Sequence, residues 1–310
     1  MDSVSYKVAV PGSLMLFGEH AVLHHKQAVV VAINHYIRVS LVPRSDKQIK
    51  IISSMFESHS ITLGKFKVTK PYDYVLTAIQ KYLTKIKQGF TLNIDSDFPS
   101  NIGFGSSAAV TVATLGVLNR WLLHKKPNLN QIYQQAVSVI RLVQGFGSGA
   151  DVAASVFGGV IAYKMRSPSI KKLNSVLSLV AVYSGSKIST AKVVVQVERQ
   201  RKQFPTVFTH LYNGIDCCTK EAIAAIKNKR WLRLGKLMNI HQGLHDALGV
   251  NNAALADLVF SLRKHSGIYG AKISGSGLGD CVIGLGKIKK NSFRRNRIDI
   301  AVSPSGLVFL

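Results

Sequence analysis

Alternating and β-branched apolar positions predict strands along much of the chain. Residues 6–10 alternate between apolar and polar, which predicts a strand that ends at the breaker pair Pro11-Gly12. Apolar runs at 28–33 and 36–42 predict a pair of strands separated by Asn34-His35. Further strands are expected at 49–54, 61–68, 90–94, 156–163, 176–183, 272–273, 281–285, 298–302 and 307–310.

Helical spacing of apolar residues follows several of these strands. Pro71 is expected to open one helix, and Gly145 to end another that starts at Asn128. Other helices are expected at 110–123, 191–201, 206–227, 230–247 and 253–265. Strands and helices interleave in both halves, which predicts an α/β or α+β protein of two domains. The polar segment 166–172 with Pro168 is the expected boundary, giving domains 1–168 and 169–310.

Composition indicates a folded globular protein. Hydrophobic residues make up 47% of the 310 residues and charged residues only 18%, the opposite of a disordered basic chain. Three cysteines, two of them adjacent, neither build a disulfide framework nor show zinc-site spacing. The sequence shows no signal peptide and no spanning helix, so we expect a cytoplasmic protein without a membrane partner.

The charge balance is strongly positive, with 40 Lys+Arg against 15 Asp+Glu and a net charge of +25. The bases are scattered, the densest cluster running from Lys287 to Arg297, and no nucleic-acid motif accompanies them. We therefore expect no nucleic-acid partner, but an affinity for small anionic ligands. Acids are scarce: between Asp97 and Glu198 the only one is Asp151. Carboxylate chemistry in that third of the chain must use it.

A central glycine loop leads directly into an apolar helix. Gly103, Gly105 and the pair Ser106-Ser107 combine close backbone approach with the free N–H groups of a first helical turn, which bind anions. The loop lacks the lysine of a Walker A motif. By itself, such a loop is more often a tight turn.

Asp151 follows a second small-residue turn, Gly147-Ser-Gly-Ala150, and its simplest interpretation is a helix N-cap. Together with the loops, a general base or an anchor for a substrate hydroxyl is favoured. A third glycine loop runs from Gly275 to Asp280, and the most specific string, Pro11 to Val22, contains Gly18-Glu-His20.

These strings resemble the three motifs of the GHMP kinases, in order, between Val8 and about Leu307. The resemblance implies an α+β two-domain fold, with an N-terminal domain like ribosomal protein S5 domain 2 and a C-terminal ferredoxin-like domain. It implies ATP in the cleft between the domains and Mg²⁺ assisting phosphoryl transfer. A homodimer is also expected, as is common among such kinases.

The resemblance implies roles for individual residues. Asp151 matches the catalytic aspartate, Glu19 and His20 the motif beside the acceptor, and Ser107 the serine that helps hold Mg²⁺. The phosphate loop corresponds to Gly103, Gly105, Ser106, Ser107 and Ala108, and the third motif to Gly275, Ser276 and Gly277.

Within the family, Gly18-Glu-His-Ala-Val22 and the 239–255 region are most similar to the mevalonate kinase branch. That branch implies phosphorylation of the C5 hydroxyl of mevalonate. The 147–154 run and Gly279-Asp280-Cys281 lean toward the phosphomevalonate kinases, which stay an alternative. A non-catalytic basic binding protein on this fold is a remote third interpretation.

Two positions depart from the mevalonate kinase pattern. Ser13 stands where that pattern has a lysine paired with the catalytic aspartate, and Ile140 stands about where it has a metal-binding glutamate. Lys7 or Lys272 is a candidate replacement for the lysine. The acid count offers no neighbouring replacement for the glutamate, so a serine and water would have to hold the metal.

Overall fold

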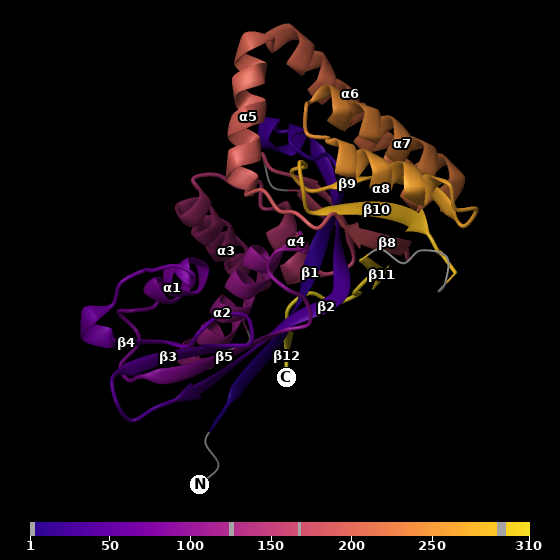
Figure 1. Cartoon of the computed structure of the whole chain (residues 1–310). Coiled ribbons are helices and arrows are strands. Elements are labelled where there is room, and N and C mark those ends of the chain that lie inside the picture. Colours follow the sequence, from indigo (N-terminus) through magenta and orange to yellow (C-terminus); the bar gives the residue numbers. More distant parts are fainter. Residues whose placement is uncertain (1–3, 124–126, 167–168, 290–295) are drawn as a thin grey trace.

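The computed structural model describes residues 4–123, 127–166, 169–289 and 296–310. These residues form an eight-stranded sheet and a four-stranded sheet, each with its own helices (Figure 1). The α+β fold in two parts is therefore confirmed. Pro168, on which the expected boundary rested, and Arg294 and Arg295 of the basic cluster lie outside the described residues.

The larger sheet has the strand order β12-β1-β2-β5-β3-β4, with β6 paired to β2 and β7 paired to β6. Neighbouring strands are antiparallel except β3 and β5, which are parallel. Their bounds are β1 Tyr6–Phe17, β2 Gln27–Pro43, β3 Gln48–Ser53, β4 His59–Thr62, β5 Phe90–Ser96, β6 Val160–Lys164, β7 Ser169–Leu173 and β12 Val308–Phe309.

The first predicted strand is longer than expected. β1 continues through Pro11-Gly12 to Phe17, because the pairing with β2 absorbs the break as a register shift between Pro11 and Ser13. Beyond that shift, Ser13 faces Ala32 and its side chain is buried. The end of the strand therefore carries Ser13 into the interior.

The predicted strand pair 28–33 and 36–42 is one strand, β2. β1 pairs along most of its length, while β6 pairs with its first part and β5 with its last part. The polar pair Asn34-His35 does not end the strand because Asn34 Oδ1 accepts a hydrogen bond from the Ala301 amide, where the C-terminal segment crosses. The strand expected at 156–163 was also wrong at its start, since helix α4 continues to Phe157.

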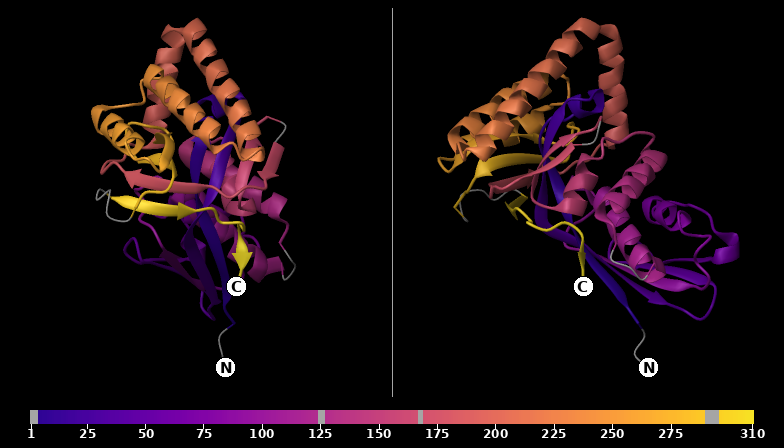
Figure 2. Two further views of the ribbon diagram at one scale, coloured as in Figure 1. Left: turned by 90° about the vertical axis from the view of Figure 1, so that its right-hand side faces the viewer. Right: turned by 180° about the vertical axis from the view of Figure 1, so that it is seen from behind.

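Helices α2 and α4 pack on the larger sheet, and α1 and α3 pack on these helices, so that the main hydrophobic core is buried between the helices and the strands (Figures 1 and 2). Their ends follow local signals: Asn128 caps α3, and Gly145 ends it in the left-handed conformation, as predicted. The bounds are α1 Asp73–Gln80, α2 Ser106–Leu123, α3 Leu129–Gln144 and α4 Ala150–Phe157, with short 3₁₀ turns η1 Ala21–His24 and η2 Leu63–Lys65.

The smaller sheet is antiparallel throughout, with the order β11-β8-β10-β9. Helices α7 and α8 pack on β9, and α6 packs on α7, so this group lies over one face of the sheet (Figure 2). The bounds are β8 Ser178–Tyr183, α5 Thr190–Gln203, α6 Pro205–Lys227, α7 Trp231–Ala247, α8 Ala253–Arg263, β9 Ile268–Ser274, β10 Cys281–Gly286 and β11 Arg297–Ala301.

The chain crosses between the two sheets more than once. β7 follows residue 168 but pairs with β6 in the larger sheet, and β12 returns from the smaller sheet to pair with β1. The division into 1–168 and 169–310 stays a prediction. Within the described ranges, none of the helices has the length and apolar character needed to span a bilayer.

Helix α7 lies unusually close to β9 at one glycine contact. A Cβ on Gly235 would lie 2.3 Å from the Tyr269 carbonyl oxygen, and one on Gly270 would lie 2.0 Å from the Gly235 carbonyl oxygen. Two glycines thus let the helix backbone touch the strand, which sets the position of every α7 side chain that faces the interior.

We predict that Gly235→Ala lowers the stability of the protein by about 1–3 kcal/mol, because the backbones must separate. Gly243 is the matched control on the same helix, since a Cβ there would meet no atom within 4 Å. Gly243→Ala should raise stability by up to about 1 kcal/mol through helix propensity. Urea unfolding of both variants measures the difference, and equal effects would contradict the packing argument.

Candidate active site

The phosphate loop predicted from the sequence lies between the side chains of Ser13 and Asp280. Helix α2 begins at Ser106, directly after Gly103 and Gly105, whose φ angles are +79° and +65°. A Cβ on Gly105 would lie 2.2 Å from Ser13 Oγ, and one on Gly103 would lie 2.7 Å from the Cβ of Asp280. Glycine is therefore required for this approach, and the free N–H groups of the first turn of α2 lie beside both residues.

Asp151 lies in the first turn of α4, where Gly149 rather than Asp151 occupies the N-cap position. Ser13 Oγ donates a hydrogen bond to Asp151 Oδ1 at 2.8 Å. Burial raises the pKa of Asp151, and the Ser13 hydrogen bond opposes that rise. The N-cap interpretation was therefore wrong, and the carboxylate is a basic group held by a single hydroxyl.

A cavity of about 200 Å³ joins these elements. Its wall includes every residue that the sequence assigned to the site except Gly277. Those residues are Glu19, His20, Gly103, Gly105, Ser106, Ser107, Ala108, Asp151, Gly275 and Ser276. Gly277 instead packs on helix-end residue Val250, whose carbonyl oxygen would lie 2.4 Å from a Cβ on it. Ile140, where the family pattern has a glutamate, also lines the cavity.

Asp280 is a cavity residue that the sequence analysis did not assign. It is 6% exposed, adopts a left-handed φ of +62°, and its Oδ1 has no hydrogen-bond partner among the described residues. Burial raises the pKa of Asp280 to about 6; Lys187 lowers it and the charge of Asp151 raises it. The acid count considered only neighbours along the chain, whereas Asp280 reaches the cavity from the third glycine loop.

Lys187 brings a positive charge to the same cavity. It lies in the segment between β8 and α5, lines the cavity, and donates from Nζ to the Ser100 carbonyl at 2.7 Å. The two lysines suggested by the sequence lie elsewhere: Lys7 is exposed on β1, and Lys272 is bound to Glu19. Their proposed pairing with Asp151 was therefore wrong.

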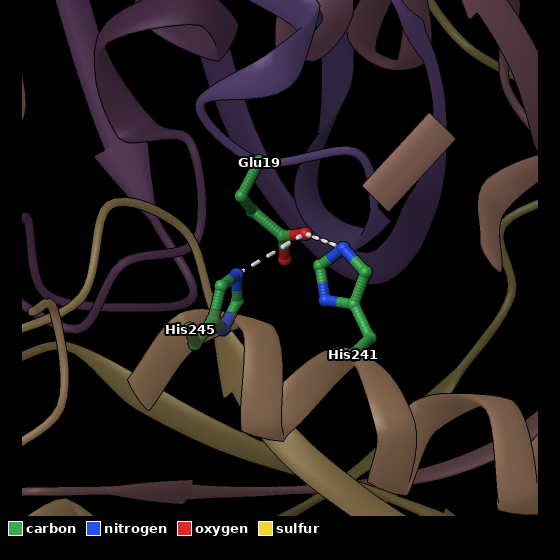
Figure 3. A group of neighbouring side chains, drawn as sticks. All are labelled: Glu19, His241 and His245. Carbon is green, nitrogen blue, oxygen red and sulfur yellow. Dashed lines mark ion pairs between the residues drawn. The ribbon is translucent and has the colours of Figure 1, made fainter. Parts of the chain in front are cut away.

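Glu19 is the centre of a buried polar cluster behind the cavity. Lys272 Nζ donates to Glu19 Oε1 at 2.5 Å and also to the Ile273 carbonyl oxygen. Figure 3 shows His241 and His245, both from α7, directed at the Glu19 carboxylate. Their Nε2 atoms lie 3.7 and 3.8 Å from Glu19 Oε2. Burial, and then the nearby Lys272 charge, hold the pKa of both imidazoles well below the usual value, so both are neutral at pH 7.

His20 connects the first motif to the third. Its Nε2 lies 2.9 Å from the Ser276 carbonyl oxygen, and burial lowers the pKa of His20. Ser274 Oγ donates to the Met15 carbonyl at 2.9 Å, a second link between the loop and β1. The sequence motifs at 11–22 and 274–280 are thus side by side.

Comparison with known proteins identifies the family. The model of the GHMP kinases N terminal domain matches residues 73–159, and that of the GHMP kinases C terminal domain matches residues 222–296. A mevalonate kinase from Archaeoglobus fulgidus is 36% identical over 289 residues, covering 92% of this chain and 94% of its own. One from Thermococcus sibiricus is 32% identical over 302 residues, covering 91% and 90%.

Solved structures agree with these sequence matches. The crystal structure of L. major mevalonate kinase in complex with R-mevalonate superposes with a TM-score of 0.78 at 26% identity, covering 97% of this chain and 96% of that chain. Both family domains, the coverage of more than nine-tenths of the chain by the relatives and the shared fold lead to one conclusion: this chain belongs to the GHMP kinase family and is similar over most of its length to the mevalonate kinases.

Proposed function

We propose that this protein is a mevalonate kinase, which transfers the γ-phosphoryl group of ATP to the C5 hydroxyl of mevalonate. The observation that carries the proposal is Asp151, held by the Ser13 hydroxyl, on the wall of a cavity that also contains the first turn of α2. The relatives reported above are mevalonate kinases, which favours mevalonate over its phosphorylated form as acceptor.

Asp151 is proposed as the proton acceptor. Ser13 occupies Oδ1, and among the described residues no hydrogen bond engages Oδ2, which is left for the acceptor hydroxyl. The hydroxyl donates its proton to the carboxylate as its oxygen forms the bond to the γ-phosphorus, and the bond to the departing ADP oxygen breaks. The N–H groups at the start of α2 and the ammonium of Lys187 stabilise charge on the phosphoryl oxygens.

The residues present fit the Mg²⁺ that phosphoryl transfer needs. The ion prefers a few oxygen ligands; Ser107 and Asp280 both line the cavity, and Asp280 Oδ1 has no hydrogen-bond partner among the described residues. Mg²⁺ supplies charge neutralisation on the phosphates. Asp280 thereby takes the place of the glutamate that Ile140 replaces.

A second cavity, of about 130 Å³, supports an adenine site. It shares Ser106 and Ser107 with the main cavity, and apart from Ser53 and Ser100 the rest of its lining is apolar or aromatic, including Phe56, Tyr74 and Val110. A flat, mostly apolar base suits such a lining, and the phosphates of the same nucleotide would reach the main cavity past the two serines.

ATP use is consistent with a cytoplasmic enzyme; a homodimer stays a prediction.

We predict that Asp151→Asn lowers kcat by about 10²–10³-fold or more while ATP binding is retained, because the amide cannot accept the proton. A coupled ADP-release assay with mevalonate, beside 5-phosphomevalonate, measures it. Near-normal turnover by this variant would show that Asp151 is not the proton acceptor. If the unaltered protein turned over only 5-phosphomevalonate, the acceptor would be 5-phosphomevalonate rather than mevalonate.

Ser13→Ala removes the one hydrogen bond that lowers the pKa of Asp151. The base is active when deprotonated, so the acidic limb of the kcat/KM profile should move to higher pH while the plateau rate changes less. A profile that drops uniformly at all pH values would mean that Ser13 positions substrate rather than tuning the base.

Asp280→Asn keeps the shape and the left-handed tolerance of the side chain but removes its charge. We expect the affinity for Mn²⁺ in the presence of ADP, measured by electron paramagnetic resonance, to fall by about 10–100-fold. In the unaltered protein this affinity should increase as pH rises through about 6, where Asp280 ionises. Asp299→Asn, an exposed acid on β11, is the charge-matched control; equal losses in both would contradict the role.

A further inference from the structure

The buried cluster behind the main cavity, Glu19, His241 and His245, contains nitrogen and oxygen atoms that have no role in the proposed kinase reaction. Glu19, His241 and His245 are 2%, 0% and 0% exposed. Glu19 Oε2, His241 Nδ1 and both ring nitrogens of His245 lack a hydrogen-bond partner within the described part of the chain. Buried polar atoms of native proteins are almost always satisfied, so the unpartnered Glu19 Oε2 and His245 Nε2, which lie 3.8 Å apart, indicate a missing ligand between them.

The geometry of the three side chains is that of a metal site. His241 and His245 are one helical turn apart on α7 and therefore share a face, with ring centroids 4.7 Å apart. Glu19 reaches between them from the turn after β1 (Figure 3). One ligand atom from each residue lies within 4.8 Å of the others, and the carboxylate oxygen is 3.7 and 3.8 Å from the two Nε2 atoms. Tetrahedral zinc bonds place ligand atoms about 3.4 Å apart, so a small contraction suffices.

We propose that Glu19, His241 and His245 bind a divalent transition-metal ion of the Zn²⁺ or Co²⁺ class, in a site separate from the Mg²⁺ of the kinase reaction. Two imidazole nitrogens and one carboxylate form a donor set that borderline metals prefer and that Mg²⁺ does not. A fourth position is left for water. Glu19 also lines the main cavity, so the proposed site lies directly beside it.

The neighbours of the cluster orient its ligands. The Gly18 amide donates a long hydrogen bond of 3.3 Å to His241 Nε2, which an ion bound at this nitrogen would replace. Lys272 holds the other carboxylate oxygen, Oε1, and so fixes the direction of Oε2. The ammonium also repels a cation, which makes the site weaker than a structural zinc finger.

The bound ion would connect the two parts of the fold. Glu19 belongs to the turn that follows β1 of the larger sheet, and the histidines belong to a helix that packs on β9 of the smaller sheet. Occupancy would therefore hold the turn with His20 in place on the wall of the acceptor cavity. The proposal does not depend on the kinase assignment, because binding is measured without substrates.

The experiment is a Co²⁺ titration of chelator-treated full-length protein in excess Mg²⁺, with no nucleotide present. We expect one equivalent of Co²⁺ to give the visible d–d absorption of a four- or five-coordinate ion, and Zn²⁺ to displace it and raise the melting temperature. His245→Leu and His241→Asn should each weaken binding by more than about 100-fold. Asn at 241 retains an acceptor for the Gly18 amide, so this variant is designed to fold.

His210→Asn, an exposed histidine on α6, is the control and should bind Co²⁺ as the unaltered protein does. Absence of the absorption in the unaltered protein would overturn the proposal and assign the cluster to water. So would equal binding by the two α7 variants and the control, which would mean adventitious surface sites.

Discussion

The arrangement of the active site depends on the buried ion pair between Glu19 and Lys272. Lys272 lies on β9 of the smaller sheet and is fully buried, and Glu19 follows β1 of the larger sheet. Removing one partner of such a pair typically costs about 3–5 kcal/mol, because the other charge is left buried and uncompensated. The pair therefore fixes one sheet on the other, and with it the approach of the first motif to the third.

Three further hydrogen bonds hold the segments of the site together around this ion pair. His20 meets the Ser276 carbonyl, Ser274 meets the Met15 carbonyl, and the thiol of Cys281 donates to the Ile102 carbonyl beside the phosphate loop. Each contact joins segments separated by more than 170 residues in the chain. The cavity is consequently formed by both parts of the fold together, and neither part alone has the full set of groups.

Sequence alone could predict the features that depend on local signals. The glycine loop before α2, the ends of α3 and the choice of Asp151 as a cavity residue all follow from adjacent residues or from the scarcity of acids. Asp280 and Lys187 could not be found in this way, since they reach the cavity from positions about 130 and 36 residues beyond Asp151, and only folding brings them close. In the sequence, His241 and His245 look like ordinary helix residues, because Glu19 comes close to them only in the folded protein. The continuity of β2 was missed for a similar reason, because a distant segment satisfies Asn34.

The return of the chain to the larger sheet has a consequence for how the protein can be divided. A cut at residue 168 would remove β7 and the C-terminal strand β12 from the sheet to which they belong, and would expose the edges of β6 and β1. The first fragment would lack two strands of its sheet, and the second would carry β7 and β12 without their partners. We therefore expect the two sheets to unfold in a single cooperative transition, and the halves to be poor candidates for separate expression or for exchange between relatives.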